Sequence, residues 1–272
     1  MEFFKYSGAG NLFVILDGRG QDVSSCREAG AVSRICREYG TDGLMILDSS
    51  QEYDFRMEFY NPDGSSGMMC GNGGRCIAAF AASLGIAPAG DEYVFEAPDG
   101  VHTAKILRNC GGKAVVRLGM RDVAGIDGIM DGWFLNTGTR QFVKFVTGVE
   151  GMDVMEEGRK LRWDGAFAPE GTNVCFVEDM GGGTLKVRTF EKGVEGETLA
   201  CGTGIVASAI AAFRAGIAPA RTEGRRVFYD IKARIDELSA SISSPPPPLK
   251  ASSSPAPRSR IYKNLRKFAL IR

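Results

Sequence analysis

The sequence CGNGGRC at residues 70–76 begins one apolar segment rich in small residues, and the sequence CGTG at residues 201–204 begins another, 131 positions later. The flanking residues keep the same spacing. Phe59 and Phe190 each precede their cysteine by eleven positions, and Gly85 and Gly216 each follow it by fifteen. A register held over so many separated points indicates a duplicated unit of about 130 residues, which is the size of a domain.

Each cysteine sequence follows a strand pattern and precedes a helix pattern. Polar and apolar residues alternate over 54–59 and 186–190, which predicts two half-buried strands. Residues 77–84 and 205–215 are apolar nearly all round, and each segment ends just before a glycine, so we expect two buried helices with glycine stops. Residues 21–38 favour a third, partly exposed helix, and most of the remainder favours short strands.

Composition is that of a folded, globular protein with enough residues for two cores. The chain has 272 residues, of which 44% are hydrophobic and 24% charged, enough for two domains of ordinary size. We expect an N-terminal half at 1–118 containing Cys70 and a C-terminal half at 119–240 containing Cys201. Residues 241–272 form a tail rich in proline, serine and basic residues.

Charge and cysteine usage exclude several classes of protein. The last 28 residues contain seven of the 33 basic side chains and none of the 33 acidic ones, so the body of the chain is mildly acidic and does not favour nucleic acid. The N-terminus lacks the order of a signal peptide, and no apolar run is long enough to span a membrane. Seven cysteines, an odd number, favour free thiols in the cytoplasm over a disulfide framework.

Cys70 and Cys201 are the candidates for chemistry. The predicted helices place both at helix N-termini, where unpaired N–H groups and the helix dipole lower the pKa of a thiol and also bind a carboxylate. Glycines there let a ligand approach the backbone closely. The other five cysteines are interpreted as buried structural residues; they are Cys26, Cys36, Cys76, Cys110 and Cys175.

Two thiols facing one cleft suit the inversion of a stereocentre. One thiolate removes a proton from a carbon, and the opposed thiol returns a proton to the other face. Helix-end N–H groups that hold the carboxylate of an amino acid stabilise the enolate-like intermediate. This chemistry requires neither a metal nor a pyridoxal cofactor.

Five sequence motifs resemble those of the diaminopimelate epimerase family, which are cofactor-independent two-cysteine enzymes of lysine and peptidoglycan precursor synthesis. The motifs are SGAGN, FYNPDG, MCGNGGRC, EGTNV and FEKGVEGETLACGTG, and the resemblance extends from the N-terminus to about residue 240. It implies two pseudo-symmetric α/β halves, each a curled, mostly antiparallel sheet around a central helix, with the site between them. It also implies a small amino-acid substrate and a possible homodimer.

The resemblance assigns roles residue by residue. Cys70 and Cys201 correspond to the catalytic pair, and Glu191 to the acid that orients the substrate amine and tunes the thiols. The remaining matched positions correspond to substrate-binding residues, which are Asn11, Asn61, Asn173 and Lys192, together with Gly71, Asn72, Gly202 and Thr203, whose backbone N–H groups would hold the reacting carboxylate.

Three departures from the family pattern affect the site. Arg140 and Gln141 stand where the family commonly has a histidine thought to tune the cysteines, and the only histidine, His102, is expected at the surface in a strand turn. Lys192 replaces an arginine that grips the distal carboxylate, and lysine lacks the bidentate fork. The first motif begins with Ser7 and continues after Asn11 with Leu12, where the family has His and Asp.

The C-terminus departs most. From Leu238 onward, proline and serine dominate where the family continues with strands that close the second sheet, and this composition predicts a flexible or polyproline segment with unfilled strand positions. The alternative is a linker followed by a short basic helix over residues 262–271.

Other functions remain as alternatives. A zinc module would need clustered ligands, and a thiol redox protein would need a close pair such as CxxC; neither pattern is present. A racemase of another amino acid, such as proline or histidine, is the enzymatic rival, although the proline racemase pattern has histidine where Asn72 stands. A non-catalytic amino-acid-binding homologue is the remaining alternative.

Overall fold

A computed structural model of the chain describes residues 1–67, 69–120, 122–243 and, for the backbone alone, 267–271. The chain divides into two compact units, one formed by residues 1–119 and 270–272 and the other by residues 120–269. The boundary lies one residue from the division expected between the two halves.

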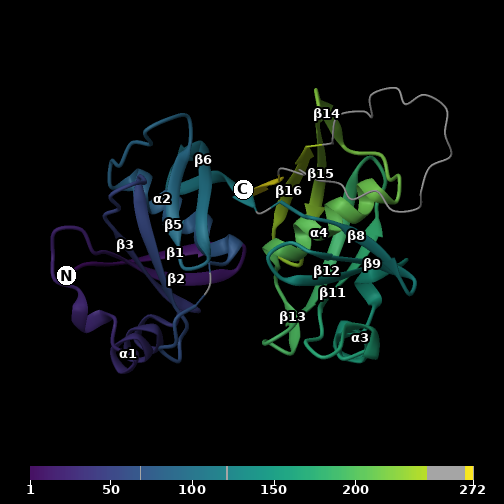
Figure 1. The fold of residues 1–272 in the computed structure, drawn as a ribbon, viewed down its shortest axis with the longest axis horizontal. Coiled ribbons are helices and arrows are strands. Elements are labelled where there is room, and N and C mark those ends of the chain that lie inside the picture. The colour runs from purple at the N-terminus through teal and green to yellow at the C-terminus, as the bar shows by residue number, and fades with distance from the viewer. Residues whose placement is uncertain (68, 121, 244–266, 272) are drawn as a thin grey trace. The chain divides into compact units, whose positions relative to one another are not determined.

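The first unit is a mixed sheet in which the strands pair in chain order (Figure 1). The pairs β2–β3 and β4–β5 are parallel and the other four are antiparallel. Each parallel pair is joined by a helix, as a parallel connection requires. The elements are β1 (Phe3–Gly8), β2 (Asn11–Asp17), η1 (Ser24–Cys26), α1 (Ala29–Tyr39), β3 (Gly43–Asp48), β4 (Phe55–Tyr60), α2 (Gly71–Ser83), β5 (Tyr93–Ala97), β6 (Gly100–Cys110) and β7 (Lys113–Met120).

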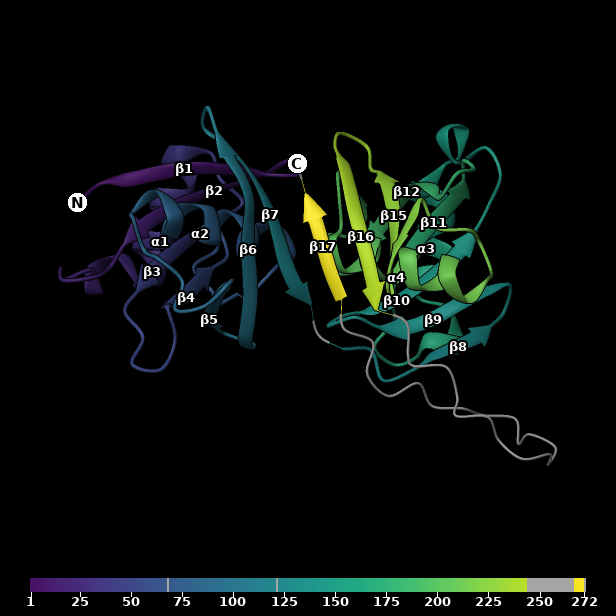
Figure 2. The ribbon, with the colours of Figure 1, turned by 90° about the horizontal axis from the view of Figure 1, so that it is seen from above.

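The second unit repeats this topology. Strands β9, β10, β11, β12, β15 and β16 pair in that order, with β10–β11 and β12–β15 parallel, and Figure 2 shows several of them side by side. Helices α3 and α4 connect the parallel pairs. The elements are β8 (Ile126–Ile129), β9 (Gly132–Asn136), β10 (Arg140–Phe145), η2 (Val149–Gly151), α3 (Val154–Arg162), η3 (Gly165–Phe167), β11 (Asn173–Asp179), β12 (Thr184–Glu191), β13 (Gly196–Thr198), α4 (Gly202–Arg214), β14 (Arg221–Glu223), β15 (Arg226–Lys232) and β16 (Glu237–Ser243). Strand β17 (Lys267–Ile271) crosses the division between the two units, which falls after residue 269.

One helix of each unit lies against the concave face of its sheet. Helix α2 contacts β1, β2, β3 and β6, and α4 contacts β9, β10, β11, β12, β15 and β16. Their small and apolar residues are buried almost all round, which is why both segments are apolar on every face. The expected fold, two curled and mostly antiparallel sheets each around a central helix, is confirmed.

The opposite face of each sheet carries the other helix. Helix α1 packs with Val32, Ile35 and Cys36 against buried strand residues that include Val14 and Leu44. In the second unit the corresponding cluster joins Val154 of α3 and Phe167 of η3 to strand residues that include Phe142, Phe176 and Phe190. Strands β2, β3 and β11 are covered on both faces, and their central residues form continuous apolar runs rather than alternating ones.

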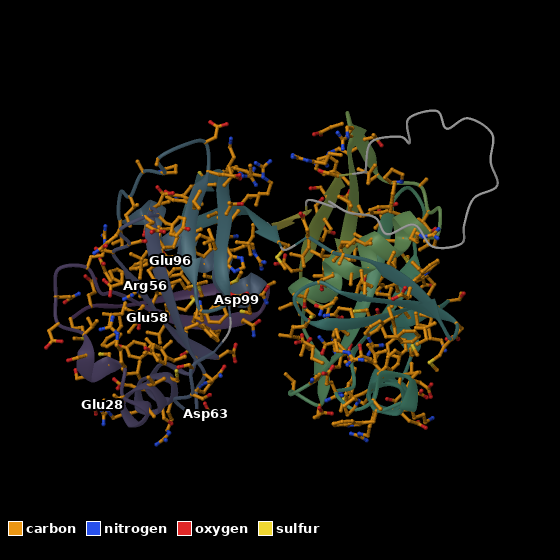
Figure 3. All side chains as sticks on the ribbon, viewed as in Figure 1. Glu28, Arg56, Glu58, Asp63, Glu96 and Asp99 are labelled. Carbon is orange, nitrogen blue, oxygen red and sulfur yellow. The ribbon has the colours of Figure 1, made fainter. Side chains whose placement is uncertain are left out.

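An ion-pair group fastens the start of α1 to the first sheet. Arg27, just before α1, pairs with Asp48 of β3 and Glu58 of β4, each at 2.9 Å. Arg56, labelled with Glu58 on β4 in Figure 3, pairs with the same two carboxylates. The expected helix over 21–38 is wrong at its start, because residues 24–26 form a 3₁₀ turn and α1 begins only at Ala29.

The expectations for His102 and Cys110 are wrong. His102 lies on β6, is buried, and its Nε2 is 3.0 Å from Oδ1 of Asp99, which Figure 3 labels. The ring also packs beside Phe95, so the alternation of β6 turns it inward rather than to the surface. Cys110 is exposed at the end of the same strand, whereas Cys26, Cys36, Cys76 and Cys175 are buried as expected.

The strand content of the tail was underestimated. Residues 238–243 belong to β16, which pairs antiparallel with β15 over its full length. Leu238, Ala240 and Ile242 are buried on one side of this strand, so alternation outweighed the abundance of serine. Residues 267–271 form strand β17 and not a basic helix. The proline-rich stretch lies outside the described residues.

Candidate active site

Cys70 and Cys201 are built into the same local structure. Each is the N-cap of a 13-residue helix, α2 or α4. The Cys70 Sγ accepts a hydrogen bond from the Gly73 N–H at 3.2 Å, and the Cys201 Sγ accepts one from the Gly204 N–H at 3.4 Å. A sulfur in this position receives both an N–H donor and the positive end of the helix dipole, and both favour a thiolate.

A glycine at the third helical position leaves room for sulfur atoms in both cases. A Cβ on Gly73 would lie 3.3 Å from the Cys70 sulfur and 3.2 Å from the sulfur of Met45. A Cβ on Gly204 would lie 3.3 Å from the Cys201 sulfur and 2.7 Å from the sulfur of Cys175. The glycines therefore leave room for the sulfur above them, as the sequence repeat implies.

A polar chain supports the mouth of α2, which we define as Cys70 and the first turn of that helix. Arg75, which is buried, donates to the Gly71 carbonyl at 2.9 Å and to the Asn72 Oδ1 at 2.7 Å. Asn72 donates in turn to the Asn11 Oδ1 at 2.6 Å, and Asn11 donates to Asp42 at 3.2 Å. Two of the predicted binding residues, Asn11 and Asn72, are thus brought together.

The mouth of α4, Cys201 and the first turn of that helix, is more enclosed. Cys201 is buried, whereas Cys70 is half-buried. The Thr203 hydroxyl lies 3.4 Å from the Cys201 sulfur and the Gln141 Nε2 lies 4.0 Å from it. The predicted residues Gly202 and Thr203 are the first two residues of α4, and Thr137 donates to the Thr203 carbonyl at 3.0 Å.

Cys201 holds its proton at neutral pH. Burial raises the pKa of this thiol well above its ordinary value, and the negative charge of Glu191 and the nearby Cys175 raise it further. The Thr203 hydroxyl and the Gly204 N–H act in the opposite direction, because both can donate to the thiolate. The thiol is therefore the resting form of Cys201 in the folded chain.

Glu191 lies at the end of β12 beside Cys201. Its carboxylate accepts a 2.5 Å hydrogen bond from the Thr198 hydroxyl on β13. Burial raises the pKa of Glu191, while hydrogen bonds from Thr198 and Cys201 lower it. The side chain is thus close enough to Cys201 for each group to affect the ionisation of the other.

Asn173 and Lys192 meet through the backbone. The Asn173 Oδ1 accepts from the Lys192 N–H at 2.7 Å, and its Nδ2 donates to the Thr139 hydroxyl at 3.3 Å. Asn173 is buried and the Lys192 side chain is exposed. Asn61 lies in the turn after β4, where its Nδ2 donates to the Ser65 hydroxyl at 3.0 Å.

Sequence reasoning gave no role to Arg75 or Thr139, and it interpreted Cys175 only as a buried structural residue. Arg75 stands inside the CGNGGRC motif and Thr139 one residue before the Arg140-Gln141 departure, so their positions within matched motifs were the available signal. Nothing in the sequence marked Cys175. Among the described residues, no group of three His, Cys, Asp or Glu side chains could hold a metal ion.

The buried thiols predict a loss of stability in alkaline solution. Burial raises the pKa of Cys76 and of Cys175 to about 12, from 9.0 for an ordinary thiol. The folded chain keeps these protons where the unfolded chain loses them, so this stabilisation is complete below about pH 9 and is lost as pH rises towards about 12. We expect each thiol to lower the free energy of unfolding by about 1.4 kcal/mol per pH unit in this range.

Urea unfolding at a series of alkaline pH values measures this loss. Cys76→Ala and Cys175→Ala are each expected to make the pH dependence shallower by one thiol's share. An unchanged slope in both variants would contradict the assignment of these two groups.

The two cysteine helices and the residues around them match one protein family. The family model described as diaminopimelate epimerase matches residues 3–120 and 133–225. The chain belongs to the diaminopimelate epimerase family. The matched ranges contain both cysteine helices, Glu191 and each asparagine predicted to bind substrate, and they end before β16.

Curated members of the diaminopimelate epimerase family align over most of the chain. The diaminopimelate epimerase of Chlorobaculum tepidum is 42% identical over 218 residues, covering 77% of this chain and 82% of that protein. The diaminopimelate epimerase of Aquifex aeolicus is 41% identical over 234 residues, covering 80% and 83%. As a member of this family, the chain is an isomerase of the epimerase class.

Solved structures of more distant proteins have the same fold as this family member. A phenazine biosynthesis protein of the PhzF family from Bacillus anthracis matches with a TM-score of 0.68 at 15% identity, over 99% of this chain and 96% of that one. A hydroxyproline epimerase from Agrobacterium vitis matches with a TM-score of 0.58 at 12% identity, over 99% and 88%. No helix in the described part of the chain is long and apolar enough to cross a membrane.

Proposed function

We propose that this protein converts LL-diaminopimelate to meso-diaminopimelate, a step towards lysine and peptidoglycan precursors, by means of Cys70 and Cys201. The observation that carries the proposal is the duplicated helix mouth. Two cysteines cap two helices in the same way, each with an N–H donor at its sulfur, in a chain of the diaminopimelate epimerase family.

The two cysteines divide the reaction into two proton transfers. A Cys70 thiolate takes the α-proton, so that the C–H bond breaks, an S–H bond forms and the electron pair moves into the carboxylate. The Cys201 thiol then gives its proton to the opposite face, so that its S–H bond breaks and a new C–H bond forms. The buried Cys201, which holds its proton at rest, is the donor in this direction.

Helix N-termini stabilise the charge that develops between these transfers. The first N–H groups of a helix have no acceptor within the helix, and at α2 and α4 they belong to Gly71, Asn72, Gly202 and Thr203. We assign these groups to the reacting carboxylate, whose negative charge grows in the transition state. Glu191 is assigned to the substrate amine, and Asn11, Asn61, Asn173 and Lys192 to the rest of the substrate.

Lys192 and Gln141 support an alternative substrate. Lysine in place of arginine keeps the positive charge but loses the paired donors that fit a distal carboxylate, and the Lys192 side chain is exposed. A related amino acid without that carboxylate is therefore the second candidate substrate. A homologue that binds an amino acid without turnover is the third candidate function.

Seven free cysteines agree with a reducing compartment, which we take to be the cytoplasm, and a homodimer is the expected assembly.

Incubation with LL-diaminopimelate in heavy water tests the proposal. We expect the α-proton signal to disappear from the NMR spectrum while the meso isomer forms with deuterium at the inverted carbon, because the proton that Cys201 returns has exchanged with solvent. Chiral chromatography separates the two isomers and gives the rate.

Parallel incubations with proline, histidine and lysine separate the candidates. Exchange with one of these amino acids and none with diaminopimelate would reassign the substrate. Binding of diaminopimelate by calorimetry with no exchange would favour the binding protein over the enzyme.

A further inference from the structure

Gln141 occupies the centre of a hydrogen-bonded group beside Cys201. It lies on β10, has no exposed surface, and contacts Thr139, Thr203 and Cys175 through its amide. We propose that Gln141 is a positioning residue that, through Thr139 and Thr203, turns a series of hydrogen-bond donors towards the Cys201 sulfur and so stabilises its thiolate. The stabilisation of the Cys201 thiolate does not depend on the proposed function. Its use in catalysis does rest on the proposed function.

The orientation of the Gln141 amide is set by Cys175. The Cys175 thiol lies 3.4 Å from the Gln141 Oε1 and 3.5 Å from the Thr189 hydroxyl. When Thr189 donates to the sulfur, the Cys175 proton is left for the Gln141 oxygen, which can only accept. The NH₂ group must then face the other way, where Thr139 lies at 2.8 Å and Thr203 at 3.0 Å. Each of its two N–H bonds has one hydroxyl to donate to.

Thr139 can donate only to Thr203. The Thr139 oxygen receives one hydrogen bond from Gln141 and a second from the Asn173 Nδ2 at 3.3 Å. The Asn173 amide is itself oriented, because its Oδ1 accepts from the Lys192 backbone N–H. A hydroxyl has two lone pairs and one proton, so with both lone pairs used the Thr139 proton is directed to Thr203, 2.9 Å away.

The same count directs Thr203 to Cys201. The Thr203 oxygen receives donors from Gln141 and Thr139, which use both of its lone pairs. Its proton is left with the Cys201 sulfur, at 3.4 Å. Two fixed amides at one end thus determine the direction of every hydrogen bond up to the thiol.

The series serves Cys201 at the moment when it becomes charged. When Cys201 gives its proton to a substrate carbon, its sulfur is left as a buried thiolate facing Glu191 and Cys175, both of which disfavour negative charge there. Thr203 and the Gly204 N–H then donate to it, and hydrogen bonds to the charged form stabilise that form. The Gln141 amide does not titrate, so it keeps the same direction of hydrogen bonding at every pH at which the protein is folded. A histidine at position 141 would instead gain or lose a proton near neutral pH.

The pH dependence of Cys201 alkylation tests the proposal without any substrate. Iodoacetamide modifies the thiolate, and peptide mass spectrometry follows Cys201 separately from the other cysteines. In Gln141→Met, which keeps the volume and removes the amide, we expect the pKa of Cys201 to rise by about one unit, so that alkylation at a fixed pH slows about tenfold. Gln141→Glu should raise it further, because a carboxylate cannot donate and adds a negative charge.

Three more variants make the test specific. Thr139→Val removes one link of the series while leaving Gln141 in place, and it should also raise the pKa of Cys201. Tyr229→Phe is the control, because it removes a hydroxyl of the buried Tyr229 on β15 that donates to the Ile217 carbonyl and lies outside the series; it should leave the titration of Cys201 unchanged. Gln141→His should restore alkylation at high pH and introduce a second ionisation near neutral pH.

An unchanged Cys201 titration in both Gln141→Met and Thr139→Val would overturn the proposal. The test of Gln141 and the test of the proposed function can fail separately. If the chain has no epimerase activity but the pKa of Cys201 shifts in the variants, the donor series stands and the assigned reaction is wrong. If the chain is active but the pKa of Cys201 does not shift, the reaction stands and the donor series is wrong.

Discussion

Replacing either Cys70 or Cys201 by serine is expected to lower the rate of epimerisation by about 10²- to 10⁴-fold, the range attributed to a positioned proton-transfer group. A serine hydroxyl is a far weaker acid than a thiol, so it neither forms the base at neutral pH nor gives up a proton as readily. Both single variants should keep the fold, because serine can accept the same N–H hydrogen bond at a helix N-cap. Formation of meso-diaminopimelate, followed by chiral chromatography, measures the loss.

Cys36→Ala is the control for these variants. Cys36 is a buried cysteine in the α1 cluster of the first unit, so its loss costs some stability while leaving both helix mouths intact. Turnover that drops equally in all three variants would point to a general loss of folded protein. Turnover retained by Cys70→Ser and Cys201→Ser would exclude the two-thiol mechanism.

Gly183→Ala is expected to destabilise the protein by about 3–5 kcal/mol, the largest effect on folding that we predict. Gly183 is buried just before β12 and has a φ of +75°. A Cβ there would lie 1.9 Å from the backbone nitrogen of Ala220 and 2.4 Å from the carbonyl carbon of Pro219. Backbone atoms cannot rotate away, so β12 or the segment before β14 would have to move.

Gly181→Ala provides a matched comparison two residues away. Gly181 has a φ of +81°, and a Cβ there would meet nothing within 4 Å. The Gly181→Ala variant is therefore expected to lose about 1–2 kcal/mol for an alanine in a left-handed conformation. It has no steric clash like the one between residue 183 and Ala220. Urea unfolding of the two variants therefore isolates the contact with Ala220, and equal free energies of unfolding would show that this contact is relieved at no cost.

The repeat of the two cysteine sequences was sufficient to predict the central helices. Both α2 and α4 end before glycines in left-handed conformations, Gly85 with φ +74° and Gly216 with φ +81°, as their apolar patterns and stops indicated. The alternation over 54–59 and 186–190 predicted β4 and β12 equally well. These elements carry their own local signal, either a period or a stop residue.

Sequence reasoning was weaker where tertiary contacts decide. His102 is polar, yet Asp99 and Phe95 make its burial favourable. Strand β16 is rich in serine, yet it pairs with β15. The partners that make these positions acceptable come from other segments, which a local pattern does not contain.

The candidate site shows the same division. The cysteines, Glu191 and the asparagines were predicted from motifs, and their roles remain predictions. The contact between Cys175 and Gln141 joins β11 to β10 and has no counterpart in the motifs. The replacement of a histidine by glutamine was visible in the sequence as a loss. Its physical consequence depends on the direction in which the Gln141 amide points. That direction depends on neighbours from β11, from the turn before β10 and from α4.

The duplicated helix mouth also suggests how the two thiols of a symmetric ancestor came to differ in acidity. Two identical thiols in identical surroundings have the same intrinsic affinity for a proton, so neither is set in advance as the acid or the base. Here one copy stands partly in solvent and the other is enclosed beside a carboxylate. After duplication, divergence in the surroundings rather than in the reacting atoms would have been enough to give each thiol its own task.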